Sequence, residues 1–291
     1  MIDPNLMILA GGVSSRMKKS IAESDGIDPS VKQEAEQKSK SMITVGNSHR
    51  PFLDYLLFNA RDVGYDDILI IVSEHDTSIR DHYGSKEKDN SFKGLRISYA
   101  VQRVPAGRTK PLGTADAVQQ GLTTHTEWNG RKFTVCNSDN LYSRQALRLL
   151  FESKHPNAMI DYDRSALQFE SSRISQFSVT QKDSEGFLVN ILEKPSAEEV
   201  ERARGRSTYV GVSMNIFQLD YDMVFPFLRD VPLHPERGEK ELPVAVNMMI
   251  HQHPKSMFAF PLAEHVPDLT SLHDLRNVQQ YLAKEFSRLN W

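Results

Sequence analysis

The sequence has 291 residues, of which 39% are hydrophobic and 25% are charged, a balance typical of a soluble globular protein with one large domain or two smaller ones. The formal net charge of -3 provides no basic excess that would indicate binding to nucleic acid or to an anionic membrane. Cys136 is the only cysteine, no apolar run approaches the ~20 residues of a membrane span, and the N-terminus lacks the basic start of a secretory signal, so we expect a cytoplasmic protein without disulfides.

In the first half of the chain, apolar runs alternate with segments of helical spacing. The run Leu6 to Ala10 predicts a buried strand, and Asp28 with Pro29 is typical of a helix start, so residues 30–37 should form a short helix. Further strands are expected at 68–72, 95–101, 133–136 and 158–162, helices at 52–63, 114–121 and 144–153, and loops at 85–93 and 103–112. This alternation predicts a mainly parallel sheet with helices on both faces.

From about residue 170 the pattern changes. Residues 178–181 and 188–192 flank the polar turn 183–186, which predicts a β-hairpin. One strand is expected at 209–217, a last strand at 258–260 and a terminal helix at 272–289. We interpret these segments as an elaboration of the same sheet, because no linker or internal repeat separates them from the first half.

The stretch that follows the first predicted strand is polar and begins with two glycines. Gly11 and Gly12 have no Cβ, so the backbone can turn sharply there and approach a ligand closely. N–H groups in such a loop bind anions, and Arg16 can form paired hydrogen bonds with phosphate oxygens. The stretch therefore predicts a nucleotide phosphate site at the carboxyl end of a parallel strand, although an ordinary turn is the commoner explanation of two glycines taken alone.

Several motifs together resemble those of the sugar-phosphate nucleotidyltransferases, also called sugar nucleotide pyrophosphorylases. Residues 9–17 resemble that family's Leu-Ala-Gly-Gly-x-Gly-Thr-Arg-Leu, with an ending closer to the molybdenum-cofactor guanylyltransferases. The most specific match is residues 111–118, Pro-Leu-Gly-Thr-Ala-Asp-Ala-Val, which is similar to the family's Gly-Thr-Ala-x-Ala-(Val/Leu) and favours sugar nucleotides over molybdopterin. Shorter matches lie at residues 39–42, 50–53, 137–140, 193–195 and 267–271, and Ser138 and Thr270 stand where the family has glycine.

The resemblance implies a set of substrate-binding residues. It assigns Arg16 and Lys40 to the phosphates of a nucleoside triphosphate and Lys194 to the sugar 1-phosphate, although both lysines taken alone would be interpreted as solvated surface residues. The implied nucleotide-binding residues are Leu9, Ala10, Gly11, Gly12, Gln102, Gly113 and Thr114. Gln102 would recognise the base edge, because its amide offers both a donor and an acceptor. The implied sugar-binding residues are Asn140, Glu193 and Gly211.

Two aspartates are candidates for a metal site. Mg²⁺ prefers one or two carboxylates together with phosphate oxygens. Asp139 directly follows a predicted buried strand and is well placed to be one ligand, although a loop aspartate that caps a turn is an equal alternative. Asp268 lies beside a proline in a polar loop, and only the resemblance implies it as the second ligand. The predicted cofactor is therefore Mg²⁺.

The resemblance implies a Rossmann-like, glycosyltransferase-A-like α/β fold with a mixed, mainly parallel sheet. We expect a single domain over residues 1–291, with a nucleotide-binding half (1–165), a sugar-phosphate-binding half (166–291) and no C-terminal hexapeptide repeat domain. The polar segment 18–39 joins Arg16 to Lys40 and is predicted to form a lid over the triphosphate.

The implied activity is transfer of a nucleotidyl group from a nucleoside triphosphate to a sugar 1-phosphate, with release of pyrophosphate. A pyrimidine base is favoured, which would make the protein a uridylyl- or thymidylyltransferase. The alternative is a non-catalytic nucleotide-sugar-binding regulatory protein, suggested by the two missing glycines and by the unusual loop 18–39. A glycosyltransferase is a third class, against which Gly113-Thr114 and Glu193-Lys194-Pro195 argue. The identity of the sugar and the oligomeric state, with a homo-oligomer as one option, stay open.

Overall fold

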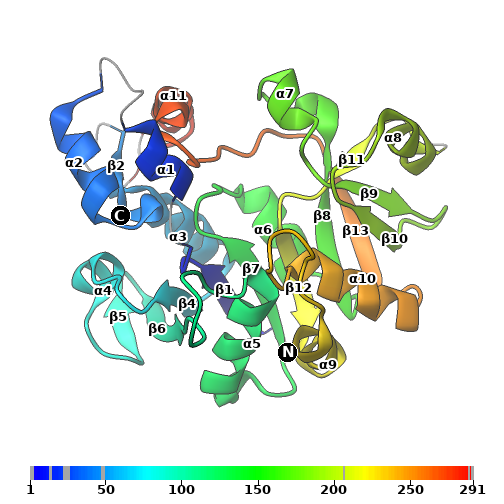
Figure 1. Cartoon of the computed structure of the whole chain (residues 1–291), viewed down its shortest axis with the longest axis horizontal. Helices are drawn as coiled ribbons and strands as arrows, with labels where there is room; N and C mark the ends of the chain where they lie inside the picture. The colour runs from blue at the N-terminus through cyan, green and yellow to red at the C-terminus, as the bar shows by residue number, and fades with distance from the viewer. Residues whose placement is uncertain are drawn as a thin grey trace.

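The structure is a computed structural model, and it describes residues 3–12, 15–21, 27–46, 50–205, 207–287 and 289. Its centre is an 11-stranded sheet in the order β10-β9-β11-β8-β12-β7-β1-β4-β6-β5, with β13 paired to β8 (Figure 1). The strands are β1 (Asn5–Leu9), β4 (Asp67–Ser73), β5 (Asn90–Phe92), β6 (Leu95–Gln102), β7 (Lys132–Asn137), β8 (Asn157–Asp163), β9 (Val179–Lys182), β10 (Leu188–Leu192), β11 (Gly211–Val212), β12 (Ile216–Asp220) and β13 (Met257–Leu262). A small separate sheet pairs β2 (Thr44–Val45) with β3 (Arg50–Pro51).

The sheet is mixed, and the two halves of the chain contribute differently to it. In the first half β6, β4, β1 and β7 are parallel neighbours, which is the Rossmann-like part that the alternating pattern predicts. The strands of the second half pair antiparallel with one another or with β7 and β8 of the first half, except β13, which runs parallel to β8. The expected hairpin is present, and the second half extends the same sheet, so both predictions are confirmed.

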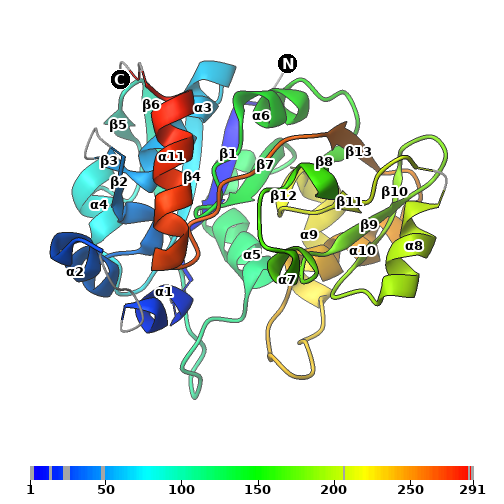
Figure 2. The same ribbon diagram turned by 90° about the horizontal axis from the view of Figure 1, so that it is seen from above.

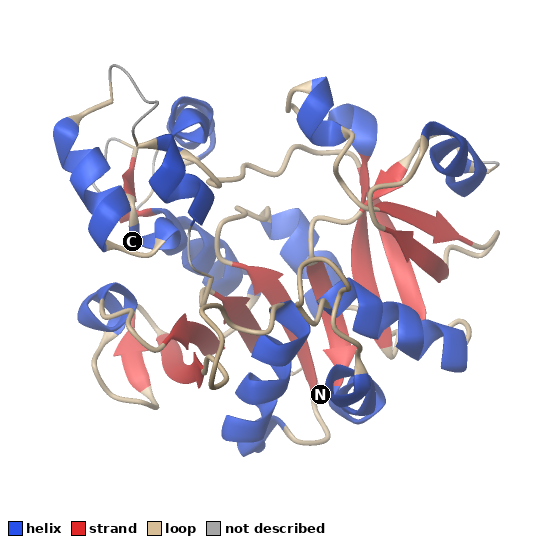
Figure 3. Ribbon diagram, viewed as in Figure 1, coloured by secondary structure: helices blue, strands red, loops and turns tan. Residues whose placement is uncertain are grey.

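Helices cover both faces of this sheet (Figure 3). They are α1 (Ser15–Ser20), α2 (Pro29–Gln37), α3 (Phe52–Val63), α4 (Ser78–Tyr83), α5 (Thr114–Thr124), α6 (Arg144–Phe151), α7 (Ser171–Ile174), α8 (Ala197–Arg204), α9 (Tyr221–Asp230), α10 (Leu242–Gln252) and α11 (Leu275–Glu285). Single 3₁₀ turns lie at Lys40–Met42, Thr126–Trp128, Arg164–Ala166 and Leu272–Asp274. No helix among the described residues is long and apolar enough to cross a membrane.

The buried residues form one hydrophobic cluster on each face of the sheet. In β1, Leu6 and Ile8 belong to the cluster that α3, α6 and α11 complete, whereas Met7 belongs to the cluster of α5, α9 and α10. Successive side chains of a strand point to opposite faces, so a strand buried on both faces must be apolar throughout. The continuous apolar run at the start of the sequence is therefore explained by helices on both sides.

Three expectations about secondary structure need correction. The single strand expected at 209–217 is wrong: β11 and β12 are separate, and Asn215 between them has a positive φ of 55° that interrupts the extended backbone. The predicted loop 85–93 contains the short edge strand β5, and the terminal helix ends at Glu285 rather than Leu289. Helices α8, α9 and α10 had no counterpart in the prediction, although α8 begins with a capping box at Ser196 and Glu199.

Candidate active site

The glycine motif that follows β1 lies beside the end of β7, because the two strands are parallel neighbours. Leu9 of β1 is paired with Ile71 of β4 and with Asn137 of β7, and the Ser138 amide donates to the Leu9 carbonyl (3.1 Å). The chain segments that follow β1 and β7 are therefore adjacent, because parallel strands end at the same edge of a sheet. Gly11 and Gly12 follow β1, and Asp139 follows the adjacent strand β7.

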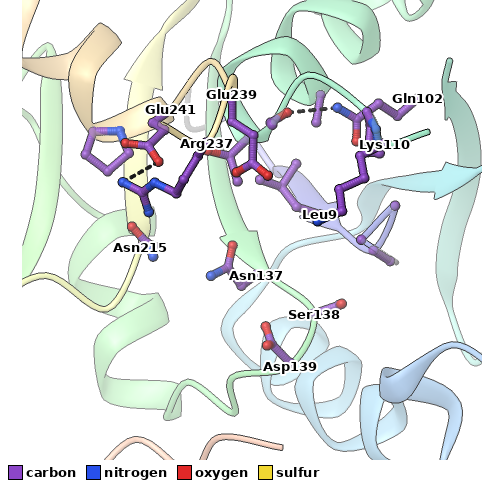
Figure 4. Close-up of a pocket in the computed structure, with 18 of the residues that line it drawn as sticks. Leu9, Gln102, Lys110, Asn137, Ser138, Asp139, Asn215, Arg237, Glu239 and Glu241 are labelled. Atoms are coloured by element: carbon purple, nitrogen blue, oxygen red, sulfur yellow. Dashed lines mark hydrogen bonds and ion pairs between the residues drawn. The ribbon is translucent and has the colours of Figure 1, made fainter. Parts of the chain in front are cut away.

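A cavity of about 520 Å³ opens at this edge. The lining includes eleven of the predicted site residues: Leu9, Ala10, Gly11, Gly12, Arg16, Lys40, Gln102, Gly113, Thr114, Asp139 and Glu193. Figure 4 shows Gln102 and Asp139, which belong to the first half, on one side of the cavity. Asn215, Arg237 and Glu241, which belong to the second half, lie opposite them. The cavity thus joins the two halves of the chain.

Asp139 and Asp268 are neighbours through their backbones. Asn140 and Asp268 form an isolated antiparallel bridge, and the Leu269 amide donates to the Asp139 carbonyl (2.8 Å). Asp139 forms an ion pair with Lys40, and Asp268 forms one with Arg173 (2.8 Å). Burial and the nearby charge of Asp139 raise the pKa of Asp268 to about 6, as expected for two carboxyl groups brought together.

This pair of carboxyl groups fits a magnesium ion. Two acidic side chains lie at one edge of the sheet, and each already faces a cationic side chain. Mg²⁺ is commonly bound by one or two carboxylates together with oxygens of substrate phosphates. Among the described residues no group of three or more His, Cys, Asp or Glu side chains is placed to hold a metal ion. Any metal here would therefore complete its coordination with phosphate oxygens and water.

Gln102 lies at the end of β6, and its amide is held by two acceptors. Its Nε2 donates to the carbonyl of Gly113 (2.8 Å) and to Oδ2 of Asp116 (3.0 Å). Gly113 itself has a φ of 103°, and a Cβ there would come within 2.6 Å of the Lys240 carbonyl. Glycine is thus required at this position by the close approach of a loop from the second half.

That loop joins α9 to α10 and projects from the same side of the molecule as residues 103–111 (Figure 2). The Ala115 amide donates to the Lys240 carbonyl (3.0 Å), and the Leu242 amide donates to Oγ1 of Thr114 (2.9 Å). In the same loop, Arg237 pairs with Glu241 (2.6 Å), and burial raises the pKa of Glu241. These contacts attach the loop to the start of α5 and bring its charged side chains into the cavity lining.

Four predicted residues do not line this cavity: Lys194, Asn140, Gly211 and Asp268. Lys194 is exposed and has a left-handed backbone with φ of 46°, although its neighbour Glu193 does line the cavity and accepts a hydrogen bond from Ser178 (2.6 Å). Gly211 is buried, and a Cβ there would collide with the side chains of Asp161 and Thr180. The structure therefore gives Gly211 a packing role.

Sequence reasoning missed several charged and polar residues of the site. Arg173 and Asp116 contact predicted site residues, and Asn215, Arg237 and Glu241 line the cavity. The sequence does carry a signal for Asn215, because asparagine tolerates the left-handed backbone found there and often marks a break between strands. Arg237 and Glu241 lie in a polar loop with no local pattern, so only tertiary contacts reveal them.

The chain belongs to the nucleotidyl transferase family, whose family model matches residues 35–283. Among curated proteins it is similar to glucose-1-phosphate adenylyltransferase 1 from two strains of Vibrio vulnificus, with 26% identity over 219 residues. That match covers 75% of this chain and 49% of the relative, so the chain spans about half the length of these curated relatives.

Solved structures of the same fold cover nearly the whole chain. A UTP-bound UGPase from Acinetobacter baumannii superposes with a TM-score of 0.70 at 16% identity, over 99% of this chain and 96% of that one. A UDP-glucose pyrophosphorylase complexed with UDP-glucose gives a TM-score of 0.66 at 15% identity, over 98% of this chain and all of that one. The predicted nucleotidyltransferase fold and the predicted family are confirmed.

Proposed function

We propose that this protein transfers a nucleotidyl group from a nucleoside triphosphate to a sugar 1-phosphate, forming a nucleotide sugar and pyrophosphate. The observation that supports this proposal most directly is the shared cavity. A glycine loop and cationic side chains line its first-half side, and polar side chains of the second half line the opposite side. The volume of about 520 Å³ is within the range of pockets that bind small-molecule substrates.

On the nucleotide side, we assign the triphosphate to the loop Gly11–Gly12 together with Arg16 and Lys40. Gly12 is exposed, and a Cβ there would meet no atom within 4 Å, so space beside the backbone is free for phosphate oxygens. Arg16 is exposed at the start of α1 and lines the cavity. An arginine can bind pyrophosphate oxygens through paired hydrogen bonds and stabilise the charge that develops on the leaving group.

We assign Mg²⁺ to Asp139 and Asp268. Once bound, the ion would neutralise charge on the phosphate oxygens during transfer. The residues of the chain would respond by changing partners: Lys40, now paired with Asp139, would become available to the triphosphate. Arg173 also pairs with Asp274 (2.5 Å), so it could keep that partner while Asp268 faces the metal.

On the sugar side, we assign hydroxyl groups to Glu193 and the 1-phosphate to Lys194, with Asn215 as an additional polar contact that the sequence did not predict. Asn140 is buried and its backbone pairs with that of Asp268. It would keep the metal site in place on the side where the sugar phosphate binds. A carboxylate accepts from several hydroxyl groups, and an ammonium group is a compact partner for a phosphate.

The reaction then needs no nucleophile from the protein. An oxygen of the sugar 1-phosphate forms a bond to the α-phosphorus, and the bond from that phosphorus to the bridging oxygen of the β-phosphate breaks in line with it. Pyrophosphate leaves with the bonding electron pair. Alignment of the two substrates and neutralisation of their charges would provide most of the rate acceleration.

For the base, we propose uracil or thymine, recognised at Gln102. The names of similar proteins differ on this point, since the curated relatives are adenylyltransferases and the structural neighbours contain UTP or UDP-glucose. The choice of base is therefore argued from the orientation of the Gln102 amide. The comparisons give no support to the non-catalytic alternative.

The test is a panel of nucleoside triphosphates against sugar 1-phosphates, with pyrophosphate release as the readout. We expect turnover with at least one pair in the presence of Mg²⁺ and its loss when EDTA is added. If no pair releases pyrophosphate above the background without protein, the transferase proposal fails.

A further inference from the structure

The side chain of Gln102 is fixed in one orientation. It is 4% exposed, and both N–H groups of its amide are engaged, by the Gly113 carbonyl and by the Asp116 carboxylate. Both partners are acceptors only, so the nitrogen end of the amide must face them. The oxygen end consequently points the other way.

The free end of this amide lies against the glycine loop. A Cβ at Gly11 would lie 3.1 Å from Oε1 of Gln102, and Gly11 lines the cavity. Among the described residues no donor reaches Oε1. At this position the cavity therefore offers a ligand a hydrogen-bond acceptor and no donor from the same side chain.

Asp116 is itself held by a chain of hydrogen bonds. Nε2 of Gln120 donates to the same Oδ2 of Asp116 (2.8 Å), and Oε1 of Gln120 accepts from the Arg103 amide (2.9 Å). Asp116 is 7% exposed in the first turn of α5, where a negative charge is favoured by the helix dipole. The Arg103 amide thus fixes the orientation of the Gln120 amide, and Gln120 in turn holds the Asp116 carboxylate that accepts from Gln102.

The geometry points to Asp116 as a positioning residue that makes the base subsite accept a ring N–H and reject a ring nitrogen with a lone pair. Uracil and thymine carry N3–H, which Oε1 of Gln102 can accept. Cytosine has an unprotonated N3, which would face that oxygen with a second lone pair. This inference rests on the proposed function, because it takes Gln102 as the residue that meets the base.

The experiment compares UTP, dTTP and CTP on the wild type, Asp116→Ala and Asp116→Asn, by calorimetric binding with Mg²⁺ and by steady-state kinetics. We expect wild-type protein to bind UTP or dTTP at least about tenfold more tightly than CTP. Asp116→Ala should reduce that ratio by about three- to tenfold, the effect of one hydrogen bond, with a smaller change in kcat. Asp116→Asn retains an acceptor oxygen for Gln102 and should preserve the ratio.

Gln119→Ala is the matched control, because Gln119 lies on the same helix outside this hydrogen-bond chain. Should Asp116→Ala fail to fold, Asp116→Leu fills the same space without an acceptor and carries the same expectation. Equal weakening of UTP and CTP in these variants would overturn the inference, as would wild-type protein that binds CTP as tightly as UTP or that binds none of the three. If no pyrophosphate is released, the proposed function fails but the inference about Asp116 does not, because the binding ratios are measured without turnover.

Discussion

The two halves of the sheet place the residues that line the cavity in different ways. In the parallel half, Gly11, Gln102 and Asp139 lie at or just after the carboxyl ends of β1, β6 and β7, so strand order brings them to the same edge of the sheet. In the antiparallel half, Glu193 and Asn215 come from a hairpin end and from a break between strands, and Arg237 comes from a loop between two helices. A site built on parallel strands is therefore predictable from local sequence, whereas the opposite side depends on tertiary contacts.

The largest loss of turnover is expected from a substitution in the parallel half. Asp139→Asn should reduce turnover by more than about a hundredfold while the fold is kept, because the amide is nearly isosteric but lacks the charge that attracts Mg²⁺ and Lys40. Steady-state rates at limiting Mg²⁺ measure this, with thermal unfolding as a check. Asp183→Asn in the hairpin turn is the control, since an asparagine oxygen can still accept from Glu185 and Phe187. A wild-type rate at limiting Mg²⁺ would remove Asp139 from the metal site.

A pair of cation deletions tests whether the halves bind different substrates. Arg16→Ala should weaken triphosphate binding, and Lys194→Ala should leave it intact but raise KM for the sugar 1-phosphate, each by about ten- to a hundredfold for one charge-assisted contact. Calorimetry with the triphosphate beside steady-state kinetics separates the two effects. Lys255→Ala is matched to Lys194→Ala, because Lys255 is also exposed and has a left-handed backbone with φ of 60°. If Lys194→Ala behaves like this control, another residue binds the sugar phosphate.

Two glycines distinguish a ligand-binding role from a packing role. Gly12→Ala should leave the unfolding temperature unchanged, since its Cβ meets no atom, but weaken triphosphate binding by severalfold. Gly211→Ala should lower the free energy of unfolding by roughly 1–3 kcal/mol, because its Cβ would collide with Asp161 and Thr180 in a buried cluster. Thermal unfolding and calorimetry on both variants provide the comparison. A stable Gly211→Ala with a raised KM for the sugar 1-phosphate would restore the sugar-binding role first predicted for Gly211.

The smallest effect concerns the segment between Arg16 and Lys40. Residues 22–26 lie outside the described residues, while Lys18 and residues 36–39 line a second cavity of about 590 Å³ beside Gly11 and Gly12. If this segment covers bound triphosphate, amide hydrogen exchange in α2 should slow by a few-fold on adding nucleotide. Exchange in α8, far along the chain in the other half, is the internal control. Equal exchange in α2 with and without saturating nucleotide would contradict the lid.

The sequence by itself determined the parallel half of the fold and its edge of the site. Strands β1 and β4 are nearly continuous apolar runs because both faces of the sheet are buried, and β6 and β7 carry shorter runs, so these strands are visible without a structure. The short motifs that follow β1 and β7 then predicted Gly11, Arg16 and Asp139 in one cavity, and the structure places all three there. Local patterns were sufficient because each residue lies next to the strand that positions it.

Only the tertiary structure decided which groups these residues meet. The pairing of Asp139 with Lys40 spans 99 positions of sequence, and the contact between Arg173 and Asp268 joins the short helix α7 to a segment far along the chain with no shared pattern. Arg237 and Glu241 reach the cavity because the loop between α9 and α10 hydrogen-bonds to the start of α5. The orientation of the Gln102 amide follows from acceptors at residues 113 and 116, whose positions depend on the turn of the following helix. Such long-range and directional contacts leave no periodic trace in the sequence, so they become visible only once the chain is folded.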